Sequence, residues 1–176
     1  AAYEIVPTQE LRYTHVGFVL VLCFLLFPMA PRFRNRIQWW DVLLGAAAVG
    51  ILGYAIAGGE DFTDRATLPT RLDVILGVIF IALLIEASRR TIGMVVPIIA
   101  LGFIAYALFG ESLAGVLSHA GVDLPDLMMN LWYSFDGVFG RPMAVVTGTI
   151  IVYIVFGAMV EGLGVGEVLL KLSIRG

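Results

Sequence analysis

The chain has 176 residues, of which 60% are hydrophobic and 14% charged, and its formal net charge is -3. A water-soluble fold of this length could not hide so much apolar surface, so a soluble domain is excluded. A nucleic-acid partner is disfavoured because the sequence has no basic patch that could neutralise phosphates. The composition predicts an all-α, polytopic helical membrane protein.

Five stretches without Lys, Arg, Asp or Glu approach the length of a membrane span: 13–31, 42–59, 74–85, 91–110 and 142–160. A bilayer core of about 30 Å requires about 20 residues of helix. The twelve residues of the third stretch would cover only about 18 Å. That stretch must recruit its charged flanks in order to span, and the alternative is a buried half-helix. We expect about five transmembrane helices.

The sequence offers no pattern of residues for a disulfide or a metal site. Cys23 is the only cysteine, so no intrachain disulfide can form. His15 and His119 have no Cys, His or carboxylate neighbours at ligand spacing. We therefore expect no metal site, no cofactor and no enzyme activity.

The second stretch carries a face of small residues. Ala46, Gly50, Gly53 and Ala57 recur at i, i+4, i+7 and i+11. Helices in lipid associate through close backbone approach, so this face predicts packing against a neighbouring helix. In the fourth stretch, Pro97 predicts a kink or a local widening.

The loop 111–141 contains an amphipathic pattern. Its apolar positions recur with helical spacing, opposite three polar positions: Leu124, Leu127, Met128, Leu131, Trp132 and Phe135, opposite Asp126, Asn130 and Ser134. About twelve residues are too few to span, and the segment has no Lys or Arg to attract anionic lipid. It is either a helix lying in the outer membrane interface or a helix that packs on the bundle.

A turn follows this helix and leads into the fifth stretch. Two glycines and a proline break the helix within Asp136-Gly137-Val138-Phe139-Gly140-Arg141-Pro142. We expect Asp136, Gly137, Gly140 and Pro142 to shape the outer surface. A second break at 161–167 has three glycines between Glu161 and Glu167, but it lacks Gly-Lys-Ser/Thr and a preceding strand, so phosphate binding is not expected.

Segments along almost the whole chain together resemble the fused permeases of tripartite ATP-independent periplasmic (TRAP) transporters, in the TAXI branch. These segments are Thr14-His15-Val16-Gly17-Phe18 with Phe27-Pro28, Trp39-Trp40-Asp41-Val42-Leu43-Leu44, Leu68-Pro69-Thr70-Arg71-Leu72-Asp73 with Ile75-Leu76-Gly77, Glu86-Ala87-Ser88-Arg89-Arg90-Thr91-Ile92-Gly93, Val96-Pro97-Ile98-Ile99-Ala100-Leu101, Tyr106-Ala107-Leu108-Phe109-Gly110, Asp136-Gly137-Val138-Phe139-Gly140 and Phe156-Gly157-Ala158-Met159-Val160-Glu161.

The resemblance implies a domain organisation. Residues 1–110 would form the small four-helix permease domain, 111–141 an outer loop with the amphipathic helix, and 142–176 the first helix and following break of the large domain. The relatives have a further helix before Thr14 and several hundred residues after Gly166 that build the cation and solute sites. We therefore expect this chain to be a processed or partial piece.

The resemblance also implies a function. The chain would be a scaffold in the bacterial inner membrane, part of a cation-coupled carrier of organic solutes, such as carboxylates. Its partners would be the rest of the large permease domain, a periplasmic solute-binding protein and the lipid bilayer. Glu86, Arg89 and Arg90 would mark the cytoplasmic boundary. The alternative is an accessory structural subunit of a larger membrane complex, respiratory or photosynthetic, without transport activity.

The distribution of basic residues predicts the topology. Seven lie on one side of the predicted spans (Arg32, Arg34, Arg36, Arg89, Arg90, Lys171 and Arg175), and four lie on the other (Arg12, Arg65, Arg71 and Arg141). By the positive-inside rule, the side with seven is cytoplasmic, so Ala1 and the loop 111–141 face outside.

Cysteine labelling in sealed cells tests this topology. In a chain with Cys23 replaced by alanine, Ser118→Cys is expected to react with a membrane-impermeant maleimide and Arg34→Cys is not. The reverse pattern would overturn the assignment.

Overall fold

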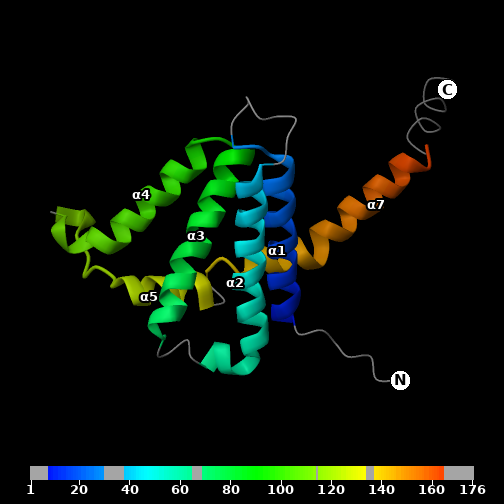
Figure 1. The fold of residues 1–176 in the computed structure, drawn as a ribbon. Coiled ribbons are helices and arrows are strands. Elements are labelled where there is room, and N and C mark those ends of the chain that lie inside the picture. Colours follow the sequence, from blue (N-terminus) through cyan, green and yellow to red (C-terminus); the bar gives the residue numbers. More distant parts are fainter. Residues whose placement is uncertain (1–7, 30–37, 65–68, 114, 134–136, 165–176) are drawn as a thin grey trace.

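The computed structural model describes residues 8–29, 38–64, 69–113, 115–133 and 137–164, and all regular structure among these residues is helical (Figure 1). The α-helices are α1 (Thr8–Leu26), α2 (Trp39–Asp64), α3 (Arg71–Thr91), α4 (Val95–Phe109), α5 (Leu124–Met128), α6 (Arg141–Val145) and α7 (Ile151–Gly162). Short 3₁₀ turns follow α4, and single π-helical segments follow α5 and α6: η5 (Met129–Tyr133) and η6 (Val146–Ile150).

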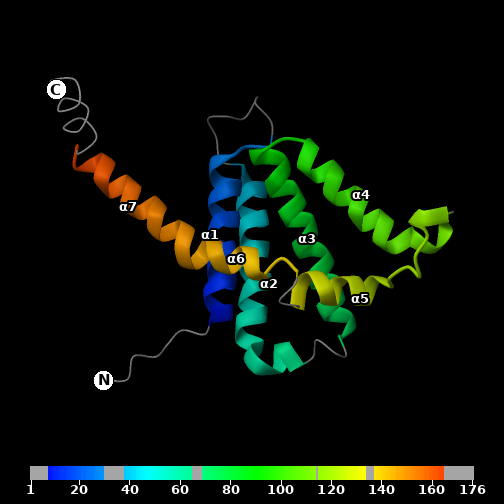
Figure 2. The same ribbon diagram turned by 180° about the vertical axis from the view of Figure 1, so that it is seen from behind.

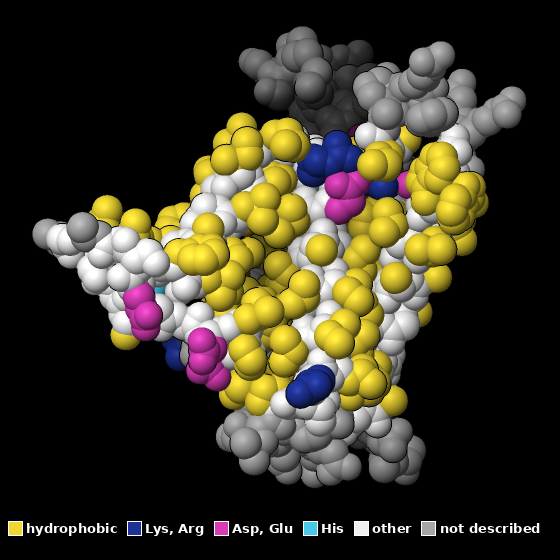
Figure 3. Space-filling model, turned by 60° about the vertical axis from the view of Figure 1, so that its left-hand side comes forward, with side chains coloured by type: hydrophobic (Ala, Val, Ile, Leu, Met, Phe, Trp, Pro, Cys, Tyr) yellow, Lys and Arg dark blue, Asp and Glu magenta, His cyan; other side chains and the backbone are white. Residues whose placement is uncertain are grey.

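Four helical stretches are long and apolar enough to cross a membrane: Gln9–Leu26, Trp39–Gly59, Val95–Ser112 and Arg141–Gly162. Hydrophobic side chains cover the middle of the face that Figure 3 presents, and charged side chains lie near its upper and lower edges and on the part that projects to the left. An apolar belt between charged rims is the surface that a bilayer requires. The all-helical, membrane-type fold expected from the sequence is thus confirmed at this level.

Helices α1, α2 and α3 lie side by side as a bundle, and both ribbon views agree on this arrangement (Figures 1 and 2). Small residues bring α1 and α2 close together. A Cβ on Gly17 would lie 3.1 Å from Leu52 Cδ1, and one on Gly45 would lie 3.8 Å from Val21 Cγ2. Phe24 and Ala48 are fully buried between these helices. Close approach of this kind maximises dispersion contacts, which hold helices together in lipid.

Helix α3 has 21 residues and extends well beyond the uncharged stretch 74–85. Thr70 begins it with a capping box: its side chain accepts a hydrogen bond from the Asp73 amide, and the Asp73 carboxylate accepts one from the Thr70 amide. Arg89 and Arg90 lie in the last turn, where cations are favoured by the helix dipole. The helix extends into both flanks, so the half-helix alternative is wrong. Helix α3 is not among the four candidate spans, and its crossing of the membrane stays a prediction.

The break in the fourth stretch lies at Gly93 and not at Pro97. Gly93 has φ +94°, a left-handed conformation that favours glycine, and α4 begins two residues later at Val95. Pro97 therefore lies in the first turn of α4, where an intrahelical donor is not required. The predicted kink at Pro97 is wrong for this reason.

The small-residue face of α2 does not carry packing within the described part of the chain. Ala46, Gly50, Gly53 and Ala57 are all exposed, and a Cβ on Gly50 or Gly53 would meet nothing within 4 Å. The buried face of α2 contains larger residues instead, among them Ile51 and Leu52. The predicted packing of this face against a neighbouring helix therefore stays a prediction.

The amphipathic segment packs on the bundle. Met128 and Tyr133 are buried, and Trp132 is fully buried, whereas Asp126 and Asn130 point outward. A Cβ on Gly77 of α3 would lie 3.5 Å from Met128 Sδ, so α5 lies directly against α3. The widened π turn of η5 places the consecutive residues Trp132 and Tyr133 both in the core. The predicted helical face is therefore a packing face, and a position in the membrane interface stays a prediction.

The turn after η5 is tucked into the bundle. Gly137 lies so close to η5 that a Cβ there would collide with the carbonyl oxygens of Asn130 and Leu131. The Val138 amide donates to the Leu131 carbonyl at 3.0 Å, and Phe139 and Gly140 are buried. Pro142 lies in the first turn of α6. Asp136, also expected in this turn, lies outside the described residues.

The last helical stretch leans away from the bundle. Helices α6, η6 and α7 follow one another from Arg141 to Gly162, and both views show α7 projecting away from α1 (Figures 1 and 2). Only 6% of this stretch is buried. Thr147 donates its hydroxyl to the Met143 carbonyl at 2.9 Å, as expected for a hydroxyl within a span. The helix ends before Gly164, whose φ is +69°, and the rest of the predicted break lies outside the described residues.

The collision at Gly137 predicts a position-specific loss of stability. Gly137→Ala is expected to destabilise the fold by about 2 kcal/mol or more, because the methyl group must displace backbone carbonyls. Gly148→Ala is the matched control, since a Cβ there meets nothing within 4 Å. Thermal unfolding in mild detergent measures both variants. Equal midpoints would show that the turn is not held against η5.

Candidate functional site

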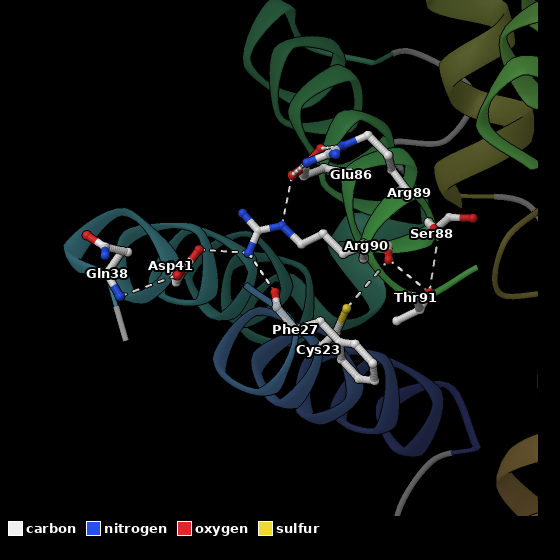
Figure 4. A network of polar contacts seen from close by, with 10 residues as sticks. Cys23, Phe27, Gln38, Asp41, Glu86, Ser88, Arg89, Arg90 and Thr91 are labelled. Atoms are coloured by element: carbon white, nitrogen blue, oxygen red, sulfur yellow. Dashed lines mark hydrogen bonds and ion pairs between the residues drawn. The ribbon is translucent and has the colours of Figure 1, made fainter. Parts of the chain in front are cut away.

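A charged cluster joins three helices at one end of the bundle. It consists of Asp41 on α2 and of Glu86, Arg89 and Arg90 on α3, and it also contacts the end of α1 (Figure 4). The arginines come from the last turn of α3, and Asp41 comes from the first turn of α2. Because α2 and α3 run antiparallel, the start of one helix lies beside the end of the other.

Arg90 is the centre of the cluster. Its Nη1 donates to Asp41 Oδ1 at 2.7 Å and to the Phe27 carbonyl at 3.1 Å, and its Nε donates to Glu86 Oε1 at 2.8 Å. The exposed fraction is 0% for the Arg90 side chain and 2% for that of Asp41. An ion pair buried to this degree is strongly destabilised when one partner is removed, because the other charge stays buried without compensation.

Two contacts from α1 complete the surroundings of Arg90. The guanidinium carbon lies 5.1 Å from the centre of the Phe24 ring, within the range of a cation–π interaction. Cys23 Sγ lies 3.6 Å from the Ala87 carbonyl oxygen and donates to it. All three helices of the bundle are therefore tied together at this level.

Glu86 and Arg89 form the outer rim of the cluster. Arg89 donates through Nε and Nη2 to the two carboxylate oxygens of Glu86, both at 2.7 Å. This bidentate pair is more exposed than the Arg90 pair, with exposed fractions of 31% for Arg89 and 25% for Glu86. Pairs that retain contact with solvent contribute little to stability.

A second polar contact ties α2 to α3 at the opposite end of the bundle. The buried carboxylate of Asp73 accepts hydrogen bonds from Tyr54 Oη at 2.8 Å and from Thr70 Oγ1 at 2.7 Å. The Thr70 amide also donates to this carboxylate, at 3.0 Å. Each helix of the α2–α3 pair is thus bound to the other near both ends.

An aromatic cluster lies beside Asp73 and gathers rings from four helices and the turn. Its members are Tyr13, Tyr54, Phe62, Phe80, Trp132, Tyr133 and Phe139. Tyr133 stacks on Phe62 with the ring centres 4.3 Å apart, and Phe139 stacks on Phe80 at 5.6 Å. Rings at these distances contribute about 0.5–1.5 kcal/mol per pair beyond area burial.

Arg12 fastens the turn to α1 beside the aromatic cluster. Its Nη1 donates to the Phe139 carbonyl oxygen at 2.6 Å. The Phe139 ring meets Tyr13 edge to face, with centres 4.5 Å apart. The turn is therefore held by one charge-assisted hydrogen bond and by its own buried ring.

The charged cluster, the Asp73 contact and the aromatic cluster all hold helices together. Within the described ranges no three His, Cys, Asp or Glu side chains lie close enough to hold a metal ion. A polar cavity of about 520 Å³ lies between the end of α4 and α5, and its lining includes Glu111, Asp123 and Asp126. These three carboxylates are exposed.

The sequence-predicted residues fall into three groups. Glu86, Arg89 and Arg90 come together in the charged cluster. Gly137 and Gly140 lie in a turn that packs against the bundle, and Pro142 is exposed in the first turn of α6. The small-residue face of α2 lies apart from both. Sequence reasoning missed Asp41, Asp73 and Phe24 as partners; a carboxylate near the start of a helix indicates a capping role, and Asp41 and Asp73 each occupy such a position.

Comparisons with family models, with curated proteins and with solved structures find no match to this chain.

The burial of Arg90 predicts an unequal effect of two neighbouring substitutions. Arg90→Met is expected to cost about 3 kcal/mol or more, because it leaves Asp41 buried without its partner. Arg89→Met is the matched control and is expected to cost about 1 kcal/mol or less. Thermal unfolding in mild detergent measures both.

A double variant separates the pair from the rest of the cluster. Arg90→Met combined with Asp41→Leu is expected to recover part of the lost stability, since both buried charges are then absent. A double variant less stable than Arg90→Met alone would contradict this account of the pair.

Proposed function

We propose that the chain is the static scaffold of a cation-coupled secondary transporter of the TRAP type in the bacterial inner membrane. The transporter takes up organic solutes, carboxylates in the first place, that a periplasmic binding protein delivers. In alternating access, one part of the carrier moves and another holds still against the membrane. The described helices are the part that holds still.

The observation that carries the proposal is that the segments resembling TRAP permeases meet in the charged cluster. Trp39-Trp40-Asp41 supplies Asp41, the segment that begins at Glu86 supplies both arginines, and Phe27-Pro28 supplies a carbonyl oxygen. Residues from three separate resembling segments thus share one guanidinium. This meeting of resembling segments at one buried side chain supports the proposal.

Two further resembling segments meet at the opposite end of the bundle and support the same proposal. Leu68-Pro69-Thr70-Arg71-Leu72-Asp73 supplies the Thr70–Asp73 capping box, and Asp136-Gly137-Val138-Phe139-Gly140 supplies Phe139. Phe80, which stacks on Phe139, lies two turns along α3 from Asp73. The resembling segments therefore brace both ends of the bundle.

The position of the acidic residues supports a scaffold without an ion site of its own. Each of the four candidate spans has a single carboxylate, and each carboxylate lies within three residues of an end of its span: Glu10, Asp41, Glu111 and Glu161. The middle of a span is where a buried carboxylate would indicate ion transport. In carriers of this kind, unwound backbone elsewhere coordinates the cation.

We include α3 as a fifth span in this proposal. Its 21 residues extend about 31 Å, which matches the hydrocarbon core. It lies beside α1 and α2, both of which contain candidate spans (Figure 1). Arg71 and Asp73 lie in its first turn and Arg89 and Arg90 in its last, and Glu86 lies one turn before these arginines. In the proposed orientation the charged cluster faces the cytoplasm and Asp73 faces the periplasm.

The second candidate is an accessory structural subunit of a larger membrane complex. The observation that favours it is the apolar character of the two grooves along the helices. One lies between α1 and α2 and the other between α3 and α4, and neither is lined by a charged side chain. A static subunit that carries no solute does not need a polar or charged cavity.

Gene deletion in the source bacterium separates the two candidates. Loss of sodium- or proton-dependent uptake of an organic acid, restored by the wild-type gene, is the result expected for the carrier. Unchanged uptake of every organic acid tested, together with loss of an assembled respiratory or photosynthetic complex, would favour the accessory subunit and contradict the transporter.

The scaffold role predicts that Glu161 takes no part in ion coupling. Glu161 is exposed at the end of α7. Glu161→Gln in the reconstituted carrier is expected to leave the Hill coefficient for the coupling ion unchanged, even if expression or rate falls. A lower Hill coefficient would refute a pure scaffold.

A further inference from the structure

An apolar groove of about 330 Å³ lies between α3 and α4. Ile81, Leu84, Ile85 and Ser88 line it from α3, and Pro97 and Ala100 line it from α4, while one residue of η5 and one of the turn also contribute. Helix α4 lies beside α3 at the end near Thr91 and diverges from it toward the other end (Figure 1). The groove is therefore a wedge between two helices that separate.

In a membrane, the groove would face the hydrocarbon chains of the bilayer. Its α4 wall belongs to the candidate span Val95–Ser112, of which only 11% is buried. Phe103, at the rim, is 70% exposed. An apolar hollow on the lipid-facing side of a span is filled by whatever apolar matter the bilayer supplies.

The size of the groove suits a single hydrocarbon chain. A cavity of about 150 Å³ holds a benzene molecule, so about 330 Å³ holds a chain segment of roughly twice that size. A helix is about 10 Å across, and one turn of it occupies on the order of 400 Å³. A further helix from this chain, or from a second copy, would not enter the groove.

One polar atom lies in this apolar lining. Ser88 Oγ is buried and has no hydrogen-bond partner among the described residues. Figure 4 shows its side chain directed away from Arg90 and the charged cluster. A buried hydroxyl without a partner is costly, so an acceptor that enters the groove would be held there.

The position of Ser88 along α3 indicates which lipid group could accept its hydrogen bond. Ser88 lies one turn from the end of α3, beside Arg89, at the boundary that the charged cluster marks. A phospholipid places its ester carbonyls at this boundary, below its phosphate. The bonds to Glu86 occupy Nε and Nη2 of Arg89 and leave Nη1 for a phosphate oxygen.

We propose that the α3–α4 groove is a phospholipid site. One acyl chain fills the groove, Ser88 Oγ donates to its ester carbonyl, and Arg89 contacts the phosphate. The lipid fills the space between the diverging helices α3 and α4, and so keeps α4 at its angle to α3 where the two helices do not pack directly. The proposal requires that the chain lies in a membrane, but it does not depend on transport.

Native mass spectrometry of the whole chain, purified in mild detergent from membranes, tests the site. The wild-type chain is expected to retain one phospholipid. Ala100→Phe inserts a ring into the groove and is expected to lower the retained fraction about tenfold. Ala105→Phe is the matched control, because Ala105 is exposed on the same helix outside the groove lining, and it is expected to retain the lipid.

Ser88 supplies a second test that survives if Ala100→Phe fails to fold. Ser88→Ala is expected to lower lipid retention about threefold to tenfold, while Ser88→Thr keeps the hydroxyl and retains more than Ser88→Ala. Equal retention in wild type, Ala100→Phe and Ser88→Ala would overturn the site, as would a wild-type chain without lipid. A dimer that Ala100→Phe dissociates would show that a second copy fills the groove, and would also overturn it.

Discussion

The buried ion pair between Arg90 and Asp41 is the interaction on which the rest of the structure depends. A guanidinium with 0% exposure must have its charge balanced, and the acceptors of its Nε and Nη1 come from three helices, while its Nη2 has no partner among the described residues. Asp41 comes from α2, Glu86 from α3 and the Phe27 carbonyl from the end of α1. These three acceptors come together around Arg90 only when all three helices are in register. The pair therefore specifies one arrangement of the helices, in an environment where hydrophobicity alone cannot distinguish among arrangements.

The opposite end of the bundle achieves the same result with less charge. Asp73 binds Tyr54 across the α2–α3 pair, and the aromatic cluster joins η5 and the turn to all three helices. Between the two ends, contacts are apolar and close, as at Gly17 and Leu52. Among the described residues, no charged or aromatic cluster fastens α4 or α7 to the bundle, and most of the surface of these two helices is exposed. The described structure thus divides into a braced bundle and two helices with little contact to it. This division is what a scaffold beside a moving part requires.

Sequence reasoning anticipated the helices better than their contacts. Long uncharged stretches predict spans because the bilayer fixes their length, and the apolar positions at 124, 127, 128, 131 and 132 predict a helix because one face must be buried. The amphipathic pattern could not say whether lipid or protein covers that face. The small residues of α2 indicated close packing, but sequence cannot tell an intrachain neighbour from one outside the chain. Asp41 and Arg90 are 49 positions apart, and no local pattern connects them. Pro97 misled because a proline is disruptive only beyond the first turn, and the helix start at Val95 depends on the conformation of Gly93.

The central claim of the proposed scaffold role is that the α1–α3 bundle stays rigid during transport. Spin labels at exposed positions of α2 and α3, introduced as Leu43→Cys and Leu72→Cys in a chain with Cys23 replaced by alanine, report the distance along the bundle. Double electron–electron resonance in proteoliposomes measures this distance before and after a sodium or proton gradient and solute are applied. We expect the same narrow distribution in both states. A shifted or newly split distribution would contradict the claim, because it would show that the bundle takes part in the movement.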